Sequence, residues 1–394
     1  MMKTMKYYLK NIFLAASCLW LFTACNDFLT LYPEDDIVDD EYWETGEDVQ
    51  SVVASCYRFM LEDNVISRII YWGEARSDDM DYSTSASTDE QYLKDANLLS
   101  SNGLVTWGDF YKVINICNKV IKSAPAVRDR DANFTEERLH NYLAEVYTLR
   151  ALCYFYLVRS FGAVPIIHDN TDELNSGNYN SKFKVEAADV YEYIIMTLEK
   201  AMELLPARGE TGRIDRYCAE GLLAKVYLTK SGLSGTRNAD DLAKAAEYSK
   251  DVINNSGRNL LANYSDVFRL ANNKNEECLF SWHWSAGRDP WTQQNTLQSD
   301  LAMVGFDEFG DCWGGYAGPS VDLQDAFGIS ALESPETRSD TDTRRKATMM
   351  MAGDVYDYFW QDKGGFDYLR FIYDAEYGKG GPNGDYQSPT GANH

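Results

Sequence analysis

Histidine and paired cysteines are scarce in this sequence. Its 394 residues include only four histidines, none at metal-ligand spacing, and eight cysteines with no CxxC pair. There is also no P-loop, no GxGxxG after a strand, no GxSxG and no HExxH motif. Metal, redox and nucleotide sites are therefore unsupported, and we expect neither a metal nor a cofactor. Beyond the N-terminus, no apolar stretch approaches the ~20 residues that span a bilayer, so we expect no transmembrane helix.

Positive charge is also in short supply. The sequence has 37 Lys and Arg against 61 Asp and Glu, a formal net charge of −24. Nucleic acid and anionic lipid surfaces both select clustered Lys and Arg, so we expect no nucleic-acid partner. Aromatic residues, in contrast, are abundant, with 27 Tyr, 17 Phe and 9 Trp. This balance favours stacking surfaces over metal chemistry.

The first 24 residues have the form of a bacterial lipoprotein signal peptide. Three lysines precede an apolar stretch, residues 12–22, which is too short to cross a bilayer. Small residues then lead directly to Cys25, as in a lipobox, with Phe22 where Leu is more usual. We expect cleavage before Cys25, lipidation of its thiol and stable anchoring in a membrane. The alternative is an ordinary secretory signal with a chance cysteine.

The cysteines that follow Cys25 are widely separated. Four of them lie on apolar helical faces, where a buried thiol behaves as a small hydrophobe. An exported compartment would nevertheless permit disulfides, which stay open as an alternative. The six cysteines are Cys56, Cys117, Cys153, Cys218, Cys278 and Cys312.

Residues 25–46 form an acidic segment that we expect to be extended, and residues 47–256 carry a helical pattern. Apolar residues recur there at the 3.6 period of amphipathic helices. One helix is predicted to begin at Thr45 or Gly46, another after Asn133 or Thr135, and Gly162 should end the latter. We expect these helices to stack in pairs as a helical repeat. The stripes lie within residues 49–60, 107–121, 139–158, 191–205, 218–227 and 242–253.

Residues 257–394 have a different character, rich in Gly, Pro, Asp and aromatic residues without helical period. Alternation from Leu279 to Trp284 predicts a strand with three aromatic rings on one face. Four of the nine tryptophans lie between Trp282 and Trp313. We therefore predict an irregular, aromatic-rich lobe with few strands.

Two aromatic stretches are candidates for a carbohydrate site. Sugar rings present apolar faces that stack on Trp and Tyr, while their hydroxyls bond to Arg, Asn, Asp and Gln. The alternative is that these rings pack the core of the lobe itself. A glycoside hydrolase would need two nearby carboxylates, and the sequence singles out no pair among 61 acids. The candidate ligand-binding residues are Trp72, Arg76, Tyr92, Trp284, Trp291, Trp313 and Tyr316.

An ordered set of short motifs resembles the SusD/RagB family of Bacteroidetes surface lipoproteins. The set spans most of residues 25–350, and its order is more specific than any one motif. It comprises Cys25–Leu29, Trp107–Tyr111 with Asn115 and Asn118, Glu145, Arg150–Leu157, Phe161–Pro165, Gly212–Arg213, Ala224–Leu228, Tyr264–Phe268, Pro319–Ser320, Asp325–Phe327 and Asp342–Arg344.

The resemblance implies a mainly α fold in which tetratricopeptide-like helical pairs hold an irregular ligand-binding lobe. It also implies a lipid-anchored outer-membrane protein without catalysis, which binds oligosaccharide at the cell surface and acts as a hinged lid on a SusC-like TonB-dependent transporter. Arg76 and nearby aromatic residues would lie at the ligand face. Family members have a further helical pair near the C-terminus, which this chain lacks, so we expect a truncated product. The alternatives are a glycoside hydrolase on a helical scaffold and capture of peptides or another nutrient by the same lid mechanism.

Overall fold

The computed structural model describes most of the chain between Tyr42 and Met349. The structure does not describe the signal segment 1–24, Cys25 or residues 350–394. The prediction that a final helical pair is missing concerns residues 350–394 and so stays a prediction. Most of the predicted lobe beyond residue 283 also lies outside the described residues. The described residues are 42–61, 65, 69, 72–82, 87–168, 177, 182–210, 212–269, 272, 274–283, 317–328 and 341–349.

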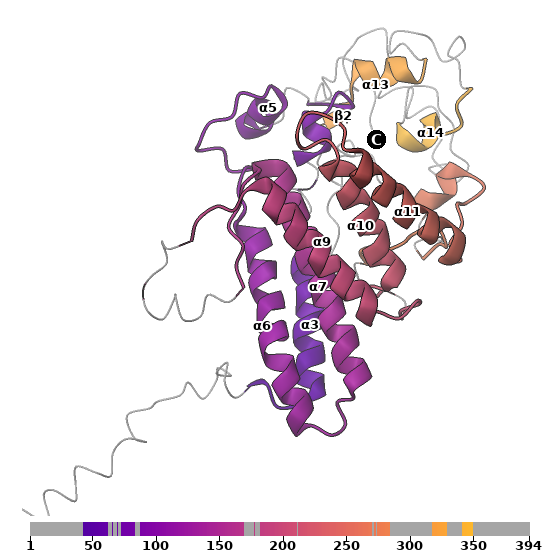
Figure 1. Ribbon diagram of the computed structural model, residues 1–394. Helices are drawn as coiled ribbons and strands as arrows, with labels where there is room; N and C mark the ends of the chain where they lie inside the picture. The colour runs from indigo at the N-terminus through magenta and orange to yellow at the C-terminus, as the bar shows by residue number, and fades with distance from the viewer. Residues whose placement is uncertain are drawn as a thin grey trace, which may run out of the picture.

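Long helices dominate the described part of the chain, and each packs against its neighbours in sequence order. α3 contacts both α6 and α7, and successive contacts then join α7 to α9, α9 to α10 and α10 to α11. Figure 1 shows the resulting stacked array, which runs from α6 at one side to α11 at the other. The predicted mainly α fold of stacked helical pairs is confirmed. The helices are α3 (Gly46–Met60), α6 (Gly108–Arg130), α7 (Glu136–Phe161), α9 (Ala187–Leu204), α10 (Arg216–Lys230) and α11 (Ala239–Asn255).

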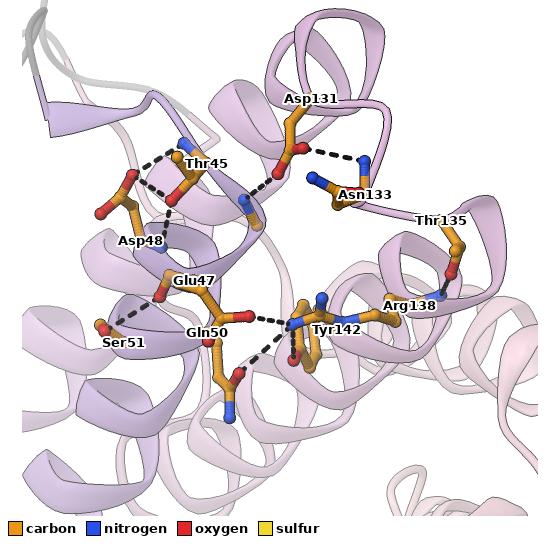
Figure 2. Close-up of polar contacts among 11 residues, drawn as sticks. Thr45, Glu47, Asp48, Gln50, Ser51, Asp131, Asn133, Thr135, Arg138 and Tyr142 are labelled. Atoms are coloured by element: carbon orange, nitrogen blue, oxygen red, sulfur yellow. Dashed lines mark hydrogen bonds and ion pairs between the residues drawn. The ribbon is translucent and has the colours of Figure 1, made fainter.

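Local capping explains where the helices begin and end. Thr45 caps α3 in a reciprocal capping box with Asp48, and Thr135 caps α7 through a bond from the backbone N–H of Arg138. Figure 2 shows both caps, together with the Asp131 carboxylate that accepts the N–H of Gly46 at 2.9 Å. α7 ends at Gly162, whose φ of 68° suits glycine. The predicted boundaries at these positions are confirmed.

The core runs continuously through the array. Cys56, Cys117, Cys153 and Cys218 are all buried, as predicted from their apolar helical faces. Cys278 is half-buried, and the five cysteines in the described part of the chain are free thiols. Cys312 lies outside the described residues. None of the helices in the described ranges combines the length and apolar character that crossing a bilayer requires.

Short elements cover one end of the array. β1 and β2 pair antiparallel as a two-stranded sheet, and α5 packs against both η1 and β1. In Figure 1, α5, β2 and α13 lie together at the end of the bundle opposite the α6–α7 turn. These elements are η1 (Glu74–Arg76), β1 (Met80–Tyr82), α5 (Thr88–Lys94), η2 (Tyr264–Phe268), β2 (Ala317–Pro319), α13 (Val321–Ala326) and α14 (Arg345–Thr348).

The predicted strand that starts at Leu279 is wrong over its described part. Residues 279–283 are irregular. The side chains of Phe280 and Trp282 pack against the core of the helical array, and their ring centroids lie 4.7 Å apart. The Leu279 carbonyl, which a strand would offer to a neighbouring strand, accepts from the Cys218 thiol at 2.6 Å and from Arg258 Nη2 at 3.2 Å. Side-chain donors from α10 and from the segment after α11 thus replace a strand partner.

Candidate functional site

The β1–β2 sheet joins the two aromatic stretches that the sequence singles out. Met80 pairs with Pro319 and Tyr82 with Ala317. β1 belongs to the first stretch, which includes Trp72, Arg76 and Tyr92, and β2 directly follows Tyr316 of the second stretch. We call η1, β1, α5, β2 and α13 together the β1–β2 platform. Segments more than two hundred residues apart in sequence therefore form one surface.

Two polar side chains hold the platform together. Lys94, at the end of α5, donates from Nζ to the carbonyls of Ser77 at 3.0 Å and Met80 at 2.5 Å, and lies 3.6 Å from the Asp81 carboxylate. The Ser320 hydroxyl donates to the Asp78 carbonyl, and the Ser320 backbone N–H donates to the Asp79 carbonyl at 3.0 Å. Neither residue was singled out from the sequence. Lys94 could have been noticed in the sequence as a lone lysine in an acidic stretch. Ser320 could have been noticed as a candidate helix N-cap.

Trp72 packs on the helical bundle. Its ring packs against Phe110 and Phe161, with centroid distances of 5.1 and 5.2 Å, and its indole N–H donates to the Leu104 carbonyl at 3.0 Å. The structure thus places Trp72 against α6 and α7, at the edge of the bundle core. Its hydrogen-bond donor is already satisfied by the backbone.

Arg76 and Tyr92 are brought together on neighbouring elements. Arg76 is exposed at the end of η1, and Tyr92 is half-buried on α5, which packs against η1. Neither side chain makes a hydrogen bond or an ion pair with any residue that the structure describes. Trp284, Trp291, Trp313 and Tyr316 lie outside the described residues.

Carboxylates surround Arg76 on the platform. Glu74, Asp78 and Asp79 are exposed, and the Asp81 side chain is 43% exposed. A guanidinium donor beside several carboxylate acceptors suits hydroxyl groups, which donate and accept at the same time. Among the described residues, no group of three or more His, Cys, Asp or Glu side chains could hold a metal ion. The arrangement is chemically suited to polar, uncharged ligands.

A buried polar network ties the helices beneath the site to the α9–α10 connection. Glu145, on α7, is only 3% exposed and accepts from Arg213 Nε at 3.1 Å and Nη2 at 2.8 Å. The Tyr57 hydroxyl, on α3, donates to the other Glu145 oxygen and accepts the N–H of Ile214 at 3.2 Å. Burial, with the Glu145 charge adding to it, raises the pKa of Tyr57, so the phenol stays protonated as a donor.

The stacked helical pairs with an irregular platform at one end define a class of helical-repeat binding proteins. A sequence model of the SusD-like family, described as "Starch-binding associating with outer membrane", matches residues 27–228. A SusD-like protein of Bacteroides ovatus is 32% identical over 388 residues, which cover 97% of this chain and 67% of that protein. The chain belongs to the SusD-like family, which confirms the resemblance seen in the sequence.

Two further similarities bear on the fold and the ligand. The starch-binding protein SusD of Bacteroides thetaiotaomicron is 29% identical over 153 residues, 38% of this chain and 26% of that protein. A crystal structure with xylogluco-oligosaccharide is 30% identical, with a TM-score of 0.67, and the match covers 80% of this chain and 60% of that chain. This chain therefore spans about two thirds of the length of the B. ovatus relative and less of the solved structure.

Proposed function

We propose that this protein binds oligosaccharide on the β1–β2 platform and does not cleave it. The observation that carries the proposal is the pairing of Tyr82, in the first aromatic stretch, with Ala317, which directly follows Tyr316 of the second stretch. The family description as starch-binding and the similar structure with xylogluco-oligosaccharide support the same class of ligand.

In this proposal, Arg76 donates hydrogen bonds to sugar hydroxyls, and Tyr92 contributes an aromatic edge and a hydroxyl. Trp284, Trp291, Trp313 and Tyr316 supply stacking faces, because the apolar face of a pyranose ring packs well on indole and phenol rings. Trp72 anchors the start of the first aromatic stretch on the bundle through Phe110 and Phe161. The exposed carboxylates of Asp78 and Asp79 accept hydrogen bonds from hydroxyls.

The position in the cell is a further part of the proposal. The family is described as associating with the outer membrane. We propose that acyl chains on Cys25 anchor the mature protein at the cell surface, since several chains on one residue give stable attachment. From there it delivers captured oligosaccharide to a SusC-like TonB-dependent transporter.

Isothermal titration tests ligand binding. Neutral oligosaccharides from xyloglucan, starch and laminarin are titrated into the protein, with a mixed peptide pool as the control for capture of another nutrient. We expect heat with at least one saccharide and a tenfold or greater loss of affinity in the Arg76→Ala/Tyr92→Ala variant. Heat with peptides and none with any saccharide would contradict the proposal.

A reducing-end assay separates binding from hydrolysis. The protein is incubated with the polysaccharide whose oligosaccharides it binds, and released reducing ends are measured over many hours. We expect none above the level of a heat-treated sample. Release that one Asp or Glu substitution abolishes would favour the glycoside hydrolase instead.

A further inference from the structure

The connection between α9 and α10 forms a wall between two cavities. We call residues 206–210 and 212–214 the Arg208 loop. One cavity, of about 430 Å³, lies between this loop, α3 and α7, and the other, of about 320 Å³, lies between the loop, the start of α10 and residues 274–283. Arg208, Gly209, Glu210 and Arg213 line both cavities. Each volume is in the range of small-ligand sites.

The frame of the two cavities is held by fixed ion pairs. Arg213 is bound by the buried Glu145, as described above. Arg138 lines the larger cavity, and Figure 2 shows its contacts with Glu47 and Gln50. Its Nη2 lies 2.9 Å from Glu47 Oε1 and 3.3 Å from Gln50 Oε1. The buried pair of Arg213 and Glu145 therefore fixes one side of the frame, while the Arg138–Glu47 pair lies at the surface.

Arg258 lines the smaller cavity, and one of its N–H donor groups has no acceptor among the described residues. Its Nη2 pairs with Asp215 at 2.7 Å and its Nε donates to the Cys278 carbonyl at 3.1 Å. The side chain is only 10% exposed, yet its buried Nη1 has no acceptor in the part of the chain that the structure describes. A buried donor of this kind costs free energy until an oxygen atom reaches it.

Several other side chains that line the cavities have few or no polar partners among the described residues. Arg208 is exposed and donates to the Gly257 carbonyl at 3.2 Å, while the Glu210 side chain has no hydrogen bond or ion pair within the described ranges. Glu137 and Asn141 in the larger cavity, and Lys274 and Glu276 in the smaller one, are likewise unpaired among the described residues.

Donors and acceptors of opposite charge therefore alternate around one loop. A carboxylate ligand would meet Glu210 and the other acids, and a cation would meet Arg208 and Lys274. A neutral sugar avoids both repulsions, because each hydroxyl donates to a carboxylate and accepts from a guanidinium or ammonium group. We propose that the Arg208 loop forms a second saccharide-binding site, separate from the β1–β2 platform and selective for uncharged sugars. This site shares with the proposed function only the class of ligand.

Ligand-observed NMR and titration calorimetry test the second site. Cellobiose and maltose are the neutral probes, and glucuronate and glucosamine are the charged ones. The wild type, the Arg208→Ala/Glu210→Gln variant and the Arg76→Ala/Tyr92→Ala variant are compared. Arg237→Ala is the matched control, because Arg237 is also an exposed loop arginine. Thermal melts of all variants report whether the fold is retained.

We expect the wild type to bind a neutral disaccharide at two sites and the charged sugars at least tenfold more weakly at the loop. The Arg208→Ala/Glu210→Gln variant should lose one site while melting like the wild type, and Arg237→Ala should keep both. Unchanged stoichiometry and affinity in the Arg208→Ala/Glu210→Gln variant would overturn the second site. Loss of all binding in the platform variant would also overturn it and leave the proposed function standing. If only the loop variant loses binding, the loop site stands and the platform assignment fails.

Discussion

The hydroxyl of Ser320 donates to the backbone carbonyl of Asp78, across a separation of 242 residues. The same Oγ accepts the N–H of Leu323 at 3.0 Å and so caps α13. One side chain therefore closes the β1–β2 platform and starts the helix that follows β2. This relationship makes the platform a single unit, although its two halves come from distant parts of the chain.

Ser320→Ala should loosen the platform. It removes a helix cap and a long-range hydrogen bond, which together are worth about 1–2 kcal/mol. We expect faster amide hydrogen exchange in residues 78–82 and 317–323 and weaker saccharide binding. Ser249→Ala, on the exposed face of α11, is the control and should leave exchange in these segments unchanged. Identical exchange in both variants would show that Ser320 does not hold the platform.

Lys94→Met should weaken binding without unfolding the bundle. The substitution keeps an apolar stem but removes the ammonium group that bonds to the Ser77 and Met80 carbonyls. Because Arg76 immediately precedes this segment, its position becomes less defined, and we expect a loss of affinity of about fivefold, ~1 kcal/mol. Calorimetric titration measures the affinity, and Lys250→Met on α11 is the control. An affinity equal to that of the wild type would mean that the bonds from Lys94 to the Ser77 and Met80 carbonyls do not position the binding surface.

Arg213→Met should destabilise the whole protein. It leaves the Glu145 carboxylate buried with Tyr57 alone, and breaking a buried pair costs about 3–5 kcal/mol. Adding Glu145→Gln should recover much of the loss, since the uncompensated charge is then removed. Urea unfolding of the two single variants and the double variant measures the coupling. Additive effects in this cycle would contradict a direct interaction.

Glu220 should make stability depend on pH. Its side chain is 2% exposed on α10, and burial, together with Asp251 on α11, raises its pKa to about 7. Arg216 lies 3.7 Å away and only partly opposes this effect. The folded state therefore holds the Glu220 proton more tightly than the unfolded state, whose pKa is near 4.5. This contribution is fully present below about pH 4.5 and is lost as the pH rises to 7.

Glu220→Gln should remove this dependence. Since each pKa unit corresponds to ~1.4 kcal/mol, the variant should gain about 3 kcal/mol over the wild type between pH 4 and pH 8. Urea midpoints across this pH range measure the difference. Glu44→Gln, at an exposed position, should follow the wild-type curve. Parallel curves for wild type and Glu220→Gln would mean that Glu220 titrates normally.

Helix boundaries were predictable because their causes are local. Thr45 and Thr135 cap helices through side chains that reach only three residues along the chain, and Gly162 ends α7 by its own backbone conformation. The burial of Cys56 and Cys153 followed from the helical period for the same reason. In each case the decisive contacts lie within one or two turns of the residue.

The candidate site was predictable only in its parts. Arg76 and Tyr92 were singled out by residue type, but their proximity depends on how α5 packs against η1. β1 and β2 are three-residue strands, which are too short to show the alternation of apolar and polar residues. The sequence pattern therefore does not predict that they pair. Lys94 and Ser320 act on backbone carbonyls, which the sequence does not distinguish from one another.

The amino-acid sequence by itself determined the class of the fold, the helix boundaries and the acidic, aromatic chemistry that suits sugars, since these depend on composition and on neighbours a few residues apart. Only the tertiary structure decided that β1 pairs with β2 and that Glu145 accepts hydrogen bonds from Arg213 and Tyr57. It also decided that the Leu279 carbonyl accepts from Arg258 and Cys218 and not from a neighbouring strand. The reason is that each of these contacts joins residues far apart in the chain, and its free energy is available only after the helices have packed.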